Sequence, residues 1–461
     1  MIIIPANTLS TGGYEVANSC RFNDGDGANM NKAYGGSTDT KFTFSAWIKR
    51  GDLGNTEALF SHWNGSSDGN RFIIYFEGDS LVAYHNSSDG NSSDMYVKTS
   101  ALYRDPSAWY HYVVAIDTTQ GTAANRVKIY TNGVQQTSLS QTTYPDQNYA
   151  VYAFDTSGTT YLGRNASGDS APTKFFDGYM AEVCLIDGTA YAASDFGEFD
   201  EDSPTIWKPK DVSGLTFGTN GTYLDFEDSG NLGDDESGNT NDLTETNIVA
   251  ADQATDTCTN NFCTANPLDQ YGSYTLSEGN CKISSGHTSW YTIGSTMAVQ
   301  NGKWYWETEF DSGTMIEIFV GVHDTSVNRT DTNSWLTGSS LFYNDAGGEI
   351  RTDGTNSTED YGTLTAGDIL GIALNMDDKQ ITLYKNGSAI ASNVALSSSI
   401  SEAMPTFLTD ANDVIFKVNF GGCSAFDVSS GNADDNGYGN FEYDVPTGYY
   451  ALCTKNLAEF G

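Results

Sequence analysis

Residues 42–48 read Phe-Thr-Phe-Ser-Ala-Trp-Ile, so that apolar and small polar side chains alternate along the chain. A period of two places every second side chain on the same face of a β-strand. The stretches 109–116, 126–130 and 381–384 have the same strand character. We find no helical period over ten or more residues, and the best candidate for a short helix is 193–196. The sequence therefore predicts an all-β protein.

Turn signals separate these strands. The chain has 48 glycines, and many of them follow Asn or Asp. Such pairs suit two-residue hairpin turns, because both central residues need a positive φ. The pairs begin at Asp24, Asn64, Asp68, Asp89, Asn132, Asp177, Asp187, Asn220, Asn301, Asp353, Asn386 and Asn436. Frequent tight turns between short strands predict antiparallel β-sandwiches.

The strand-rich stretches fall into two blocks, 13–199 and 267–461. We expect one sandwich in each block, with residues 200–266 as a connector. Residues 1–12 form an N-terminal arm and are a candidate anchor.

The connector contains Pro204, Pro209 and an acidic, Gly- and Asn-rich run at 225–242, which is typical of a linker. Its apolar residues Trp207 and Leu224 predict that it packs against the first block.

The charge excludes several functions. The chain has 60 acidic and 22 basic residues and a net charge of −38. Such a surface repels phosphates and anionic lipid, which argues against nucleic-acid binding and membrane docking. Aromatic residues make up 13% of the chain, too many for a disordered acidic tail. No apolar run reaches the roughly 18 residues of a membrane helix, and the start has no signal-peptide pattern.

The seven cysteines are odd in number and scattered, so we expect mostly buried thiols. A local disulfide between Cys258 and Cys263 is the alternative.

The first block resembles the laminin-G-like and concanavalin-A-like jelly rolls. The resemblance covers most of residues 20–200 and lies in the order of the segments 45–49, 59–61, 109–114, 127–133, 161–163 and 176–183. We expect Trp47 and Trp109 to bridge the two sheets of this sandwich, which lie about 10 Å apart in such folds.

The second block resembles the SPRY domain over about residues 267–425. Asn301-Gly302-Lys303-Trp304-Tyr305-Trp306-Glu307 is similar to a characteristic strand of that family. The hairpin at 367–387 and the segments 319–322, 405–407 and 418–421 are similar to its other core strands.

The segments 195–199, 207–210, 220–226 and 260–268 resemble a family of proteins in tailed phages of marine bacteria. The resemblance implies a tail fibre, head fibre or decoration on the virion surface, assembled in the host cytoplasm. It also implies other virion proteins as partners and a homo-oligomer, with a trimer favoured.

We expect no catalytic activity. The Glu-x-Asp-x-x-Glu strand of glycosidases with this fold is absent. Asp225 and Glu227 form a weak carboxylate pair that is better explained as a solvated turn. The Gly-x-Ser-x-Gly string at 65–69 lies in a polar loop, where it has no catalytic meaning.

Two loops of the first block share Ser-Ser-Asp-Gly-Asn, at 66–70 and 87–91. We interpret them either as similar hairpin turns or as a carbohydrate-binding rim, in which aromatic faces and polar side chains meet a sugar. The rim would comprise Trp63, Asn64, Asp68, Tyr84, His85 and Asp89. Asp68 and Asp89 are also candidate Ca²⁺ ligands, because Ca²⁺ prefers oxygen ligands.

In the second block, the resemblance implies recognition through loops at one end of the sandwich. The candidate ligand-binding residues are Trp290, His323, Trp335 and Tyr343. Burial in the core is the alternative for Trp335. The sequence thus favours a virion protein that recognises a host-surface glycan or protein; a purely structural virion component and a polysaccharide depolymerase are the alternatives.

Overall fold

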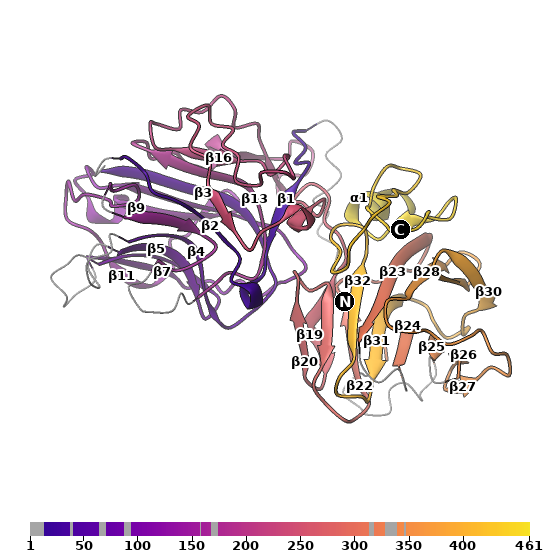
Figure 1. The fold of residues 1–461 in the computed structure, drawn as a ribbon. Coiled ribbons are helices and arrows are strands. Elements are labelled where there is room, and N and C mark those ends of the chain that lie inside the picture. The colour runs from indigo at the N-terminus through magenta and orange to yellow at the C-terminus, as the bar shows by residue number, and fades with distance from the viewer. Residues whose placement is uncertain are drawn as a thin grey trace. The chain divides into compact units, whose positions relative to one another are not determined.

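The computed structural model describes residues 13–36, 40–63, 71–86, 94–156, 158–166, 174–312, 318–327, 339–344 and 347–461. The chain divides into two compact units, and the boundary between them in the sequence falls between Thr259 and Asn260 (Figure 1). Each unit contains two large, mainly antiparallel sheets. The prediction of an all-β protein with two sandwiches is confirmed.

The first unit has two large sheets and a small hairpin. In strand order, sheet 1 contains β10 (Val134–Gln135), β9 (Val127–Thr131), β8 (Tyr110–Asp117), β3 (Lys41–Arg50), β13 (Gly178–Asp187), β1 (Ser19–Phe22) and β18 (Gln253–Ala254), with β16 (Thr222–Leu224) also paired to β13. Sheet 2 contains β11 (Leu139–Thr143), β7 (Met95–Thr99), β6 (Ser80–Asn86), β5 (Arg71–Glu77), β4 (Thr56–Trp63), β12 (Thr159–Leu162), β2 (Asn29–Lys32) and β17 (Thr244–Thr246). The hairpin pairs β14 (Gly197–Phe199) with β15 (Trp207–Pro209). Short 3₁₀ turns span Asp24–Asp26, Ala123–Asn125, Ala193–Asp195 and Ala250–Asp252.

Several predicted turns have the expected backbone. Asn132 and Gly133 have φ angles of 46° and 77°, and Asn386 and Gly387 have 48° and 76°. Each pair joins two adjacent antiparallel strands, β9 to β10 and β29 (Gln380–Lys385) to β30 (Ser388–Ala395). These turns have positive φ at both central residues, as the Asn-Gly signal predicts.

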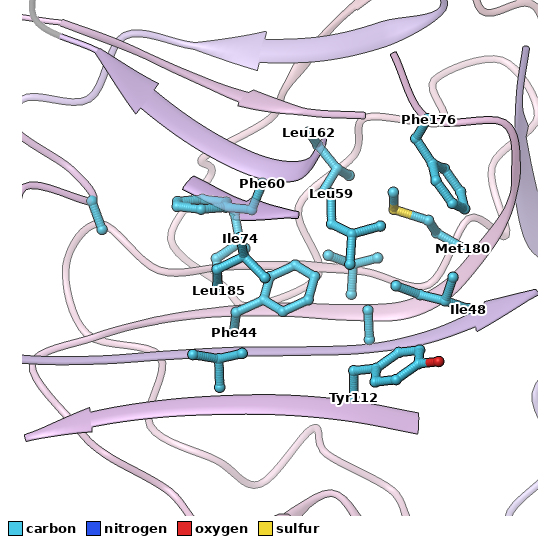
Figure 2. Close-up of a cluster of buried hydrophobic side chains, with 14 of the residues drawn as sticks. Phe44, Ile48, Leu59, Phe60, Ile74, Tyr112, Leu162, Phe176, Met180 and Leu185 are labelled. Atoms are coloured by element: carbon cyan, nitrogen blue, oxygen red, sulfur yellow. The ribbon is translucent and has the colours of Figure 1, made fainter. Parts of the chain in front are cut away.

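Apolar side chains from both sheets fill the space between them. Figure 2 shows Phe44, Ile48 and Leu185 of sheet 1 gathered with Phe60 and Ile74 of sheet 2. In β3 these inward residues recur at every second position, as the alternation at 42–48 predicts.

The other face of sheet 1 is also buried, and Trp207, which was predicted to pack against the first block, is part of its cover. Trp47 points away from the core and lies 4.9 Å from the His111 ring, measured between ring centroids, and His111 in turn stacks on Trp207 at 6.0 Å. The Trp207 indole N–H donates to His111 Nδ1 at 3.1 Å. Trp109 also lies outside the core cluster, so neither Trp47 nor Trp109 bridges the two sheets as expected.

The segment predicted as a connector builds this cover. Lys49 on the outer face pairs with Asp256 at 2.7 Å, and the Trp109 indole N–H donates to the same carboxylate at 2.9 Å. The segment also supplies strands β16, β17 and β18 to the two sheets. Residues 200–259 therefore belong to the first unit rather than linking two units, and residues 260–266 begin the second.

The second unit contains the other two large sheets. Sheet 3 contains β19 (Ala265–Tyr271), β22 (Tyr291–Ser295), β31 (Ala403–Thr409), β24 (Ile318–Asp324), β25 (Ser340–Asn344), β26 (Glu349–Thr352) and β27 (Thr355–Asn356). Sheet 4 contains β20 (Tyr274–Ser277), β21 (Lys282–Ser285), β32 (Ile415–Asn419), β23 (Lys303–Ser312), β28 (Ile369–Asn375), β29 and β30, with β33 (Tyr450–Ala451) parallel to β23. The short helix α1 (Thr454–Phe460) follows β33 and was not predicted.

The C-terminal segment covers sheet 4 and is held by a buried carboxylate. Glu307 of β23 accepts the backbone N–H groups of Glu442 and Tyr443, both at 2.9 Å. The Tyr305 hydroxyl donates to the same carboxylate at 3.1 Å. Burial raises the pKa of Glu307 to about 7, although these three donors oppose the shift.

The raised pKa of Glu307 makes the second unit less stable at alkaline pH. Protonation of Glu307 contributes stability that is fully present below pH 4.5 and is lost as the pH rises through about 7. The free energy of unfolding lost over this window is about 3 kcal/mol. We expect Glu307→Gln to flatten the pH dependence of the free energy of unfolding between pH 5 and 8, measured by urea denaturation. The exposed control Glu359→Gln should keep the wild-type slope; an unchanged slope in Glu307→Gln would refute this assignment.

All seven cysteines are buried and none forms a disulfide, including Cys258 and Cys263. The alternative of a disulfide between these two residues is therefore not supported. In the described part of the chain, no helix is long and apolar enough to cross a membrane.

Candidate ligand-binding site

The strand ends that flank the two predicted rim loops lie together. Trp63 ends β4 and pairs with Arg71, and Arg71 pairs with Asn86 at the end of β6. Trp63 and Tyr84 are half-buried. Asn64, Asp68 and Asp89, and with them the predicted Ca²⁺ ligands, lie outside the described residues.

His85 is a buried support of this edge rather than a surface contact. It is 2% exposed, and burial lowers its pKa to about 4. The Tyr149 hydroxyl donates to Asp94 at 3.0 Å and lies 3.0 Å from His85 Nδ1. The Tyr149 hydroxyl has one proton and donates it to Asp94, so it must accept a hydrogen bond from His85 Nδ1–H. His85 is therefore the tautomer that is protonated at Nδ1. The prediction that His85 contacts a ligand does not fit this burial.

His62 of β4 is also a buried supporting residue, two strands away from His85 of β6. His62, Phe72 and His85 are paired across β4, β5 and β6 and so share the inner face of sheet 2. The Thr160 hydroxyl donates to the Ala153 carbonyl at 2.9 Å and accepts from His62 Nδ1 at 3.1 Å. Burial lowers the pKa of His62 to about 4 as well. Both imidazoles are therefore neutral at physiological pH.

The candidate residues of the second sandwich are mostly structural. His323 lies in β24 and Tyr343 in β25, and both side chains are fully buried. Their predicted place in ligand-binding loops is wrong, because each is part of a strand in sheet 3. Trp290 is half-buried and packs on Phe319 with ring centroids 5.2 Å apart. Trp335 lies outside the described residues.

A polar cleft lies elsewhere on the first sandwich. Its volume is about 530 Å³, within the usual size of small-molecule sites. Its lining is polar and rich in glycine: Gly35, Gly36, Asp187, Gly188, Gly218, Thr219 and Asn220. We call it the Asp187 cleft. The sequence signalled Asp187-Gly188 and Asn220-Gly221 only as turns.

Strand pairing and hydrogen bonds fix the walls of this cleft. Asp187 ends β13, and the backbone and side-chain N–H groups of Asn220 donate to its carboxylate at 3.0 and 2.7 Å. The adjacent pairing of Leu185 with Thr222 brings these walls together. Gly36 of the third wall is bridged to Asp155.

The former connector holds the loop at 218–221 in place. The Asn239 amide donates to the carbonyls of Gly218 and Gly221 at 2.7 and 3.0 Å. The Asn241 amide donates to the carbonyls of Thr219 and Gly221 at 3.1 and 2.9 Å. Asp235 in turn accepts the Asn241 backbone N–H at 2.7 Å. The polar residues of the acidic run therefore preorganise this wall of the cleft.

The described residues contain no group of three or more His, Cys, Asp or Glu side chains arranged to hold a metal ion. Asp225 accepts the backbone N–H of Glu227 at 2.9 Å, in an exposed turn. This arrangement is that of a local turn rather than of two carboxylates facing a substrate.

Comparison with known families agrees with this architecture. Residues 23–193 match the Concanavalin A-like lectin/glucanases superfamily, and residues 303–422 match the SPRY domain. The chain therefore contains an N-terminal concanavalin A-like sandwich and a C-terminal SPRY sandwich, which confirms both domain resemblances. A search of curated proteins finds no match.

A comparison with solved structures finds matches at low sequence identity. The SPRY domain of human HERC1 is 18% identical, with 35% of this chain and 98% of that chain covered and a TM-score of 0.31. A candidate carbohydrate-binding protein from Bacteroides ovatus is 17% identical, with 39% and 46% covered and a TM-score of 0.29. A heptameric SAP-like pentraxin from Limulus polyphemus is 15% identical, with 39% and 80% covered and a TM-score of 0.27.

Proposed function

We propose that this chain is a non-enzymatic recognition protein on the virion of a tailed phage, as a tail fibre, head fibre or decoration. The concanavalin A-like sandwich binds a host-surface glycan, and the SPRY sandwich binds a protein. The observation that carries this proposal is the presence, in one chain, of two sandwiches from families whose members include binding modules. Several copies on one particle turn weak single-site contacts into avidity.

The charge agrees with display in an aqueous, salty environment. A net charge of −38 keeps a strand-rich surface soluble and discourages pairing between sheet edges. It also favours a neutral glycan over an anionic one, because like charges repel.

A bacterial glycan array probed with the full chain tests the recognition proposal. We expect binding to a small set of polysaccharides, whereas absence of binding to every polysaccharide favours the purely structural alternative. For the virion setting, mass spectrometry of purified particles should find this chain at a defined copy number. A chain that is absent from particles would overturn that setting.

A further inference from the structure

We propose that the Asp187 cleft is the glycan-binding site of the first sandwich and that its ligand is an uncharged sugar bound through hydroxyl groups. This inference rests on the proposed function and specifies where the glycan binds. The site differs from the rim predicted at 63–70 and 84–91.

The lining has the chemistry that sugar hydroxyls require. A hydroxyl group both donates and accepts hydrogen bonds, so its site needs both kinds of partner. The cleft presents the exposed Thr219 hydroxyl, which is both donor and acceptor, whereas the Asp187 carboxylate and the Asn220 amide are almost fully buried and bond to each other in the wall. One carboxylate and no basic side chain among these lining residues favours an uncharged ligand over an anionic one.

The glycines leave room for a ligand to reach the backbone. Four of the seven lining residues are glycine, so the walls carry few side chains. Gly36 has a packing reason, because a Cβ at this position would lie 2.4 Å from the Phe154 carbonyl oxygen. Neither packing nor backbone conformation requires a glycine at position 35. In the described structure a Cβ there meets no atom within 4 Å, and the φ of Gly35 is not positive. A side chain at residue 35 would therefore fill open space at the cleft.

The walls need little reorganisation before a ligand binds. The Asp187–Asn220 hydrogen bonds fix one wall, and the Asn239 and Asn241 amides fix the backbone at 218–221. A site that is already ordered loses less conformational entropy on binding, which raises affinity for a ligand that offers only hydrogen bonds.

The position of Gly35 gives a specific test. We expect Gly35→Trp to fill the cleft and to weaken binding to the glycans that the wild-type chain selects on the array by at least about tenfold. Gly121→Trp is the matched control, because Gly121 is exposed, has no positive φ and equally has no atom within 4 Å of a Cβ. Thr219→Val, which removes one hydroxyl, should weaken binding by about two- to tenfold.

The outcomes separate the site from the function. Loss of binding in Gly35→Trp, with Gly121→Trp unchanged and both variants melting like the wild type, supports the cleft. Equal binding by the wild type and Gly35→Trp overturns the cleft and leaves glycan recognition standing. An equal loss in both tryptophan variants also overturns it. A wild-type chain that binds no glycan removes both the cleft and the proposed glycan recognition.

Discussion

A fragment ending at Phe199 is expected not to fold, whereas a fragment ending at Thr259 is expected to unfold cooperatively like the first unit of the full chain. The shorter fragment contains the whole stretch matched to the concanavalin A-like superfamily, 23–193. It lacks core side chains contributed by the former connector, namely Leu224, Phe226, Leu232, Leu243 and Ile248. Burying one such side chain stabilises a protein by about 1.5–3 kcal/mol, so the five together contribute roughly 8–15 kcal/mol. That sum equals the whole stability of a typical domain.

The missing segment also pairs with both sheets of the first unit, through β16, β17 and β18. Circular dichroism and urea denaturation of the two fragments provide the measurement. A cooperative transition of the shorter fragment at the same urea concentration as the longer one would show that residues 200–259 are a dispensable linker after all.

The second large effect is expected at the buried ion pair between Lys49 and Asp256. Both side chains are almost fully buried, at 2% and 1% exposure. Asp256→Ala leaves the Lys49 ammonium without its carboxylate and removes the acceptor of the Trp109 indole N–H. Breaking a buried pair by removing one partner costs about 3–5 kcal/mol, because a charge then stays buried without compensation. We expect this loss in the free energy of unfolding of the first unit.

The matched control replaces both partners, as Lys49→Met with Asp256→Leu. Since apolar residues of similar volume can replace a buried pair at little cost, the double variant should recover most of the stability. A loss of less than about 1 kcal/mol in Asp256→Ala would mean that residues near 256 do not cover sheet 1 in solution.

Local sequence patterns predicted where the strands lie better than they predicted which residues pack against each strand. The alternation at 42–48 correctly predicted a strand, and the structure places Phe44 and Ile48 on its core face. It could not reveal that Trp47 is covered from outside, because the cover comes from Trp207, far along the chain. The resemblance to known jelly rolls encouraged the expectation that this large side chain bridges the sheets.

The composition of residues 200–266 predicted a linker, whereas the buried Trp207 and Leu224 confirm the prediction that this segment packs against the first block. Asp, Asn, Ser and Gly are typical of solvated linkers, yet Asp235, Asn239 and Asn241 bond to the backbone of a distant loop and of their own turn. The same side chains satisfy either environment. The pairing of β16 with β13 distinguishes the two environments, and that contact is long-range.

The candidate site was missed for the same reason. Asp187-Gly188 and Asn220-Gly221 are separate turn signals in the sequence, and the hydrogen bonds from Asn220 to Asp187 join them across 33 residues. Conversely, the resemblance to the SPRY domain placed His323 and Tyr343 in loops, although β24 and β25 contain both of them.

The central claim is that this chain binds a glycan and leaves it intact. The most direct measurement incubates the full chain with polysaccharide from the host surface and determines, in the same sample, how much polysaccharide the protein retains and how long the retained chains are. The account predicts retention of polysaccharide with unchanged chain length and no new reducing ends. Shortened chains with new reducing ends would show a depolymerase, and polysaccharide that is not retained at all would contradict recognition.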